Sequence, residues 1–90
     1  MNDKLLRVID LVAQLREAMR EVDGVIFCDV SRVYKDDCPG VVDGYKSEVF
    51  MAENIGFSEI EEFKSNKKLN SCYTVVDGVK VSCLEEKEEA

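Results

Sequence analysis

The first part of the chain carries the clearest pattern of apolar and polar positions. Its apolar residues recur at alternating intervals of three and four, as on one face of an α-helix: Leu5, Val8, Val12, Leu15, Met19 and Val22. The opposite side is polar and consists of Asp10, Gln14, Glu17 and Glu21. Asn2 or Asp3 can cap the start, and Gly24 suits the end. The pattern predicts an α-helix over about residues 3–22.

This apolar stripe allows two packing arrangements. Its width favours packing on a sheet within the same chain. Its strict heptad spacing also permits a pair of helices from two chains. Three heptads are short for an independent coiled coil, so packing within the chain is the preferred interpretation.

A strand follows the helix. Residues 25–31 are rich in β-branched and aromatic side chains, and the strand can continue through Tyr34. Apolar residues lie on both faces of this segment, which predicts a central position in a sheet. Residues 36–40, with the sequence Asp-Asp-Cys-Pro-Gly, then predict a turn.

The C-terminal third predicts a β-hairpin. Two apolar segments flank Asp77-Gly78, which suits a two-residue type I′ turn with positive φ at both central positions. This turn sets Cys72 directly opposite Cys83. Facing residues of this kind have Cα atoms about 5.5 Å apart, so a disulfide is geometrically allowed. Two thiols are the preferred interpretation, because the chain lacks a secretory signal.

The middle of the chain gives weaker signals. Residues 38–46 and 72–80 share the pattern Cys-x-x-Val-Val-Asp-Gly-x-Lys. A duplicated unit with a second hairpin at Asp43-Gly44 is one explanation, and reuse of common turn residues is the other. Residues 46–55 fit either a short helix or a strand. A capping box at residues 58–61 predicts a brief helix.

Together these elements predict an α+β fold, in which an N-terminal amphipathic helix packs on a small antiparallel sheet of three to five strands that ends in the Asp-Gly hairpin. A chain of 90 residues allows one domain, placed at residues 1–84 and followed by an acidic, disordered tail at residues 85–90. Surface scaling predicts a folded area of about 5,300 Å². That area leaves room for one modest core and no deep enclosed pocket.

The composition argues against several kinds of site. The chain has no histidine, so Ser-His-Asp and Cys-His mechanisms are absent within one chain. It lacks phosphate-binding glycine motifs and a Cys-x-x-Cys redox pair. Its four cysteines, Cys28, Cys38, Cys72 and Cys83, stand ten or more residues apart, unlike the close pairs of zinc sites. We therefore predict a protein that is not an enzyme, with buried thiols, no cofactor and no metal ion.

The net charge of −7 is consistent with a protein partner. An acidic surface repels a phosphate backbone and suits a basic protein surface, although a role in solubility is the simpler interpretation. No apolar run is long enough for a membrane span, and the N-terminus does not have the pattern of a secretory signal. We predict a cytoplasmic protein, monomeric or homodimeric, that binds another protein and neither nucleic acid directly nor membrane.

The candidate partner-binding residues are outward-facing hairpin side chains, one further tyrosine and exposed acidic pairs: Tyr73, Val75, Lys80, Tyr34, Asp36, Asp37, Glu61 and Glu62. The predicted function is stoichiometric protein–protein binding, with inhibition of a basic nucleic-acid-binding surface as one form. That form rests on an analogy in size and charge with small phage proteins that block host defence, as nucleic-acid mimics do. The alternative is a homo-oligomeric module that pairs through the N-terminal helix and binds a small ligand or metal between subunits. No segment resembles a known family closely enough to name one.

Overall fold

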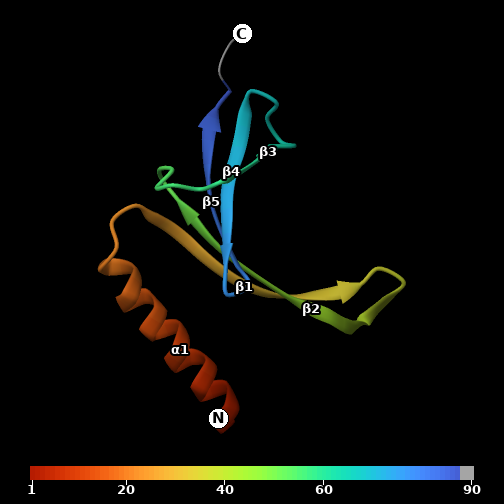
Figure 1. The fold of residues 1–90 in the computed structure, drawn as a ribbon. Coiled ribbons are helices and arrows are strands. Elements are labelled where there is room, and N and C mark those ends of the chain that lie inside the picture. The colour runs from red at the N-terminus through yellow and green to blue at the C-terminus, as the bar shows by residue number, and fades with distance from the viewer. Residues whose placement is uncertain (88–90) are drawn as a thin grey trace.

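The computed structural model describes residues 1–87 as one helix followed by five strands. Figure 1 shows them in the order α1 (Asp3–Arg20), β1 (Val25–Lys35), β2 (Cys38–Met51), β3 (Glu59–Glu62), β4 (Leu69–Val76) and β5 (Val79–Glu86). The strands form one sheet in the order β1-β2-β5-β4-β3. The predicted α+β class is therefore confirmed, as one N-terminal helix with a five-stranded sheet.

The sheet is mixed, whereas the sequence predicted an antiparallel one. Strands β2 and β5 run parallel and pair over three residues of each strand, and the other three pairings are antiparallel. The second strand of the β4–β5 hairpin, β5, lies beside β2 and runs in the same direction as β2.

Local side-chain and backbone interactions fix the start of helix α1 and the turn that follows its end. The Asn2 side chain accepts a hydrogen bond from the backbone N–H of Lys4 at 2.7 Å, which caps the first turn. An acidic residue in the first turn and a basic residue in the last suit the helix dipole. The helix ends at Arg20, two residues before the predicted end. Gly24, with φ of 89°, then redirects the chain, and its carbonyl accepts from the Ala52 N–H at 2.7 Å.

Strands β1 and β2 form a long hairpin, which decides between the alternatives left open for residues 46–55 and for Asp43-Gly44. Residues 46–51 are strand rather than helix. The structure excludes the alternative of a second hairpin at Asp43-Gly44, because both residues lie inside β2. Val33 pairs with Gly44 while Tyr34 pairs with Val42, so Asp43 is the extra residue of a register shift. A β-bulge thus accommodates this Asp-Gly pair without reversing the chain.

The helix predicted at residues 58–61 is also wrong. These residues enter β3, which pairs antiparallel with β4 over Glu59–Glu62. The Asn54 side chain accepts from the backbone N–H groups of Gly56 and Phe57 at 2.9 and 2.7 Å and forms the turn that leads into β3. The open edge of β4 then offers a ladder of backbone partners, which a four-residue capping signal does not outweigh.

The β4–β5 hairpin closes at Asp77-Gly78, where φ is 51° and 76°. Both central residues have the positive φ that a type I′ turn requires. Cys72 pairs with Cys83 across the two strands. Strand β5 continues to Glu86, so the first residues of the segment assigned to a tail belong to the sheet. Residues 88–90 of that segment lie outside the described residues.

The core of the described chain is very small. Three apolar side chains are buried, those of Met51, Cys72 and Cys83, and four half-buried residues pack against them: Val25, Val49, Phe57 and Val81. The chain exposes 7557 Å², compared with the expected area of about 5,300 Å². Its radius of gyration is 16.1 Å, compared with about 12 Å for a globular domain of this length. The fold is therefore extended, with much apolar surface uncovered.

Helix α1 contributes to this extended shape. Figure 1 shows it running away from the sheet, joined to β1 by a short turn. None of its residues is buried, and its apolar stripe is not covered by the sheet. Within residues 1–87 no helix combines the length and hydropathy needed to cross a membrane.

Candidate functional site

The apolar face of α1 is the first candidate site. We call it the α1 stripe, and it consists of Leu5, Val8, Val12, Leu15 and Met19 on the helix and of Val22, two residues beyond the end of the helix. Val8 is 56% exposed and Val12 is 60% exposed. Two shallow hollows of the surface lie along α1, and one of them is lined by Val8, Ile9, Val12, Ala13 and Arg16. An exposed apolar row of this length is typical of a surface that binds another protein.

The outer part of the β1–β2 hairpin is a second exposed surface. Strand β2 pairs with β5 between Glu48 and Phe50. The hairpin beyond these residues, which we call the arm, extends away from the rest of the sheet (Figure 1). It carries exposed apolar and aromatic side chains: Val30, Val33, Tyr34, Val41, Val42 and Tyr45. An isolated two-stranded ribbon is marginally stable in water, so the arm gains from contact with another surface.

Charge is distributed unequally between these parts. The range Asp3–Arg20 contains four basic and three acidic residues, so α1 carries a net charge of +1. The rest of the chain carries −8, which gives the whole chain its net charge of −7. All four residues of β3, Glu-Ile-Glu-Glu, are exposed at the edge of the sheet. The chain therefore combines a nearly neutral apolar helix with a sheet whose five strands together carry −4.

Several predicted partner-binding residues gather on one part of the sheet. The Lys80 Nζ lies 2.7 Å from a carboxylate oxygen of Glu61 and 4.6 Å from the centroid of the Tyr73 ring. Val75 is the direct cross-strand partner of Lys80 and is exposed. These four residues form a small mixed patch on β3, β4 and β5. Within this patch Lys80 already pairs with Glu61, so the Glu61 carboxylate is less available to a basic partner.

The remaining predicted residues lie elsewhere. Asp36 and Asp37 form the turn at the tip of the arm, and Tyr34 precedes them on β1. Glu62 ends β3, with an oxygen 3.9 Å from the Lys87 Nζ. The structure thus divides the predicted residues between the arm tip and the β3–β5 patch. It does not assemble them into one surface.

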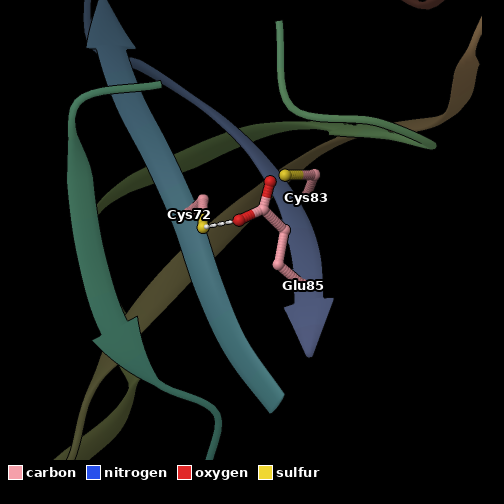
Figure 2. A group of neighbouring side chains, drawn as sticks. All are labelled: Cys72, Cys83 and Glu85. Carbon is pink, nitrogen blue, oxygen red and sulfur yellow. Dashed lines mark hydrogen bonds between the residues drawn. The ribbon is translucent and has the colours of Figure 1, made fainter. Parts of the chain in front are cut away.

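Two cysteines and a glutamate form the one group of potential metal ligands within residues 1–87. Figure 2 shows Cys72, Cys83 and Glu85 side by side on β4 and β5. Their ligand atoms lie within 4.8 Å of one another, and the Cys72 thiol donates a hydrogen bond to Glu85 at 3.4 Å. Both thiols are free and buried, whereas Glu85 is exposed.

The electrostatics of this cluster favour protonated thiols. Burial, reinforced by the hydrogen bond to Glu85 and by its negative charge, raises the pKa of Cys72 to about 11. Burial and the charge of Glu85 also raise the pKa of Cys83. Two thiolates and a carboxylate are donors that a zinc ion accepts, with a fourth position open. Binding would release the thiol protons, so the raised pKa of both cysteines opposes it at neutral pH.

The sequence interpretation does not place Glu85 beside the cysteines, because it assigns residues 85–90 to a tail. Strand β5 continues to Glu86, and the spacing of two from Cys83 to Glu85 puts both side chains on one face of that strand. The α1 stripe is exposed in the structure, and its pairing with another helix stays a prediction. No protein-family model, curated protein or solved structure matches this chain.

Proposed function

We propose that the chain is a non-enzymatic protein that acts by stoichiometric binding of another protein chain. The observation that carries this proposal is the exposed apolar surface of the α1 stripe and the arm. It belongs to a chain whose described residues bury three apolar side chains. A surface of this kind is stable in water when another protein covers it.

The amount of uncovered surface supports the same proposal. The chain exposes about 2,200 Å² more than a globular monomer of its mass. A standard protein interface removes about 800 Å² from each partner, and permanent interfaces remove more. The excess is therefore large enough for a permanent interface.

The acidic sheet gives the proposal a finer form. Outside α1 the chain carries −8, and the acids at the arm tip and on β3 are exposed. A basic protein surface would be attracted to this part, and masking of such a surface would inhibit a nucleic-acid-binding partner. This form predicts a complex that weakens as salt concentration rises.

Site-specific photo-crosslinking in the native host tests the proposal. A photoreactive amino acid is placed at Val12 in the α1 stripe or at Gln14 on the polar side of the same helix. We expect a discrete crosslinked product from position 12 and much less from position 14. The product is identified by mass spectrometry, and the complex is rebuilt from purified proteins to measure its stoichiometry and salt dependence. Equal labelling from both positions, or no fixed stoichiometry after purification, would contradict the proposal.

A further inference from the structure

Three features of α1 indicate which protein covers the α1 stripe. We infer that the occupant is α1 of a second copy of this chain, in a two-fold symmetric dimer. This inference rests on the proposed function, because it names the partner of the same surface. In such a dimer the two helices contact each other through identical residues.

The charge of the helix is the first feature. Two copies of the whole chain carry −7 each and repel one another at long range. Helix α1 itself carries +1, from four basic and three acidic residues. A strongly basic partner would be drawn to the acidic sheet and not to this helix. A nearly neutral helix of the same sequence fits the stripe without an electrostatic penalty.

The spacing of the stripe is the second feature. Alternating steps of three and four are the pattern by which side chains of two helices interlock as knobs into holes. A partner helix needs the same pattern over the same length, and a second α1 supplies it. The three-heptad length is no obstacle here, because each helix is tethered to its own sheet at Gly24, whose carbonyl bonds to Ala52.

The stability of α1 is the third feature. The helix has 18 residues and an amphipathic pattern, and most of the stability of such helices in proteins comes from packing of the apolar face. Its side-chain interactions include exposed pairs such as Gln14–Asp10 at 2.8 Å and Arg20–Glu17 at 3.2 Å, and such pairs contribute little. A helix with none of its residues buried needs an external contact to persist. Pairing of two stripes supplies that contact to both copies at once.

Sedimentation equilibrium of the full chain, with circular dichroism at the same concentrations, tests the inference. We expect a mass of twice 10.2 kDa at micromolar concentration. Val12→Lys places a charge in the centre of the paired stripes, twice per dimer by symmetry. We expect it to weaken dimerisation at least about 100-fold and to lower helical content in parallel.

Gln14→Lys is the matched control, since it makes the same charge change on the polar side of the same helix. We expect it to keep the wild-type dissociation constant within about threefold. Val12 contacts no core residue of the sheet, so both variants should retain the β4–β5 hairpin. Burial of the Cys72 and Cys83 thiols reports on that fold independently.

The outcomes separate this inference from the proposed function. A dimer that Val12→Lys dissociates and Gln14→Lys does not supports the inference. A dimer insensitive to Val12→Lys and Leu15→Lys overturns it, because the interface then lies elsewhere. A folded monomer at high concentration also overturns it. The proposed function survives if that monomer forms a purified 1:1 complex that Val12→Lys disrupts, and it fails if no such complex exists.

Discussion

The two buried cysteines show how one residue's surroundings set its chemistry. Cys72 is 2% exposed and its thiol has a pKa of about 11, compared with 9.0 for an unperturbed thiol. At about pH 8 its thiolate fraction is therefore about a hundredfold smaller than that of an ordinary cysteine. Because the thiolate is the nucleophile, we expect Cys72 to react with iodoacetamide at least about 100-fold more slowly than the exposed Cys38. Mass spectrometry of peptides after timed alkylation measures both rates in one sample. Similar rates would show that the β4–β5 hairpin opens readily.

The same thiol makes stability depend on pH. The pKa of Cys72 is higher in the folded chain, so folding favours the protonated form. This contribution is fully present below about pH 9 and is lost as the pH rises towards about 11. We expect urea unfolding to show a steeper loss of stability over this range in the wild type than in Cys72→Ala. Lysines and tyrosines titrate there too, so the difference between the two proteins is the quantity to compare.

The hairpin turn illustrates a residue fixed by backbone geometry. Gly78 has φ of 76°, a conformation that a side chain disfavours, although space around it is open. We expect Gly78→Ala to lower the free energy of unfolding by about 1 kcal/mol. Gly40→Ala is the control, since Gly40 has an ordinary φ and equally open surroundings. Urea denaturation measures both, and equal stabilities would indicate that the turn relaxes around alanine.

At the scale of elements, the sequence predicted those with strong local signals. The α1 periodicity, the first strand and the Asp77-Gly78 turn all appear in the structure within a few residues. The predicted central position of the first strand is wrong, because β1 lies at the edge of the sheet. The helix predicted at residues 58–61 is wrong, because the capping box is a local signal and does not reveal that β4 offers an unpaired edge to this segment. The pairing of β2 with β5 was not predictable from local patterns, since it joins segments more than thirty residues apart. The cluster of Cys72, Cys83 and Glu85 was not predicted for a different reason, because it needs β5 to continue through residues that the sequence interpretation assigns to a tail.

The arm and the β4–β5 hairpin should differ in local stability. The arm is a two-stranded ribbon, whereas β4 and β5 have neighbours on both sides. We expect backbone amides of residues 30–34 to exchange with solvent at least about tenfold faster than those of residues 72 and 83. Hydrogen exchange of monomeric Val12→Lys protein tests this without a dimer partner. Slow exchange in the arm would mean that it is stabilised by contacts beyond its own two strands.

At the scale of the whole molecule, folding and assembly should be coupled. In the proposed dimer, a chain with this small a core gains much of its apolar burial from its partner. We expect the melting temperature to rise with protein concentration, by several degrees for each hundredfold increase. Differential scanning calorimetry at two concentrations measures the effect, and Val12→Lys should abolish most of it. A melting temperature independent of concentration would contradict coupled folding.

The uncovered α1 stripe also affects how the protein can evolve. Surface positions of a self-sufficient domain usually accept many substitutions, because water is their only neighbour. Val8, Val12 and Leu15 are exposed in the single chain, but they become buried in the proposed dimer. In a library of all single substitutions they should tolerate as few replacements as Met51 and Cys83. The polar side of the same helix should accept most substitutions, so the pattern of tolerated substitutions would show which face of the helix is buried in the interface.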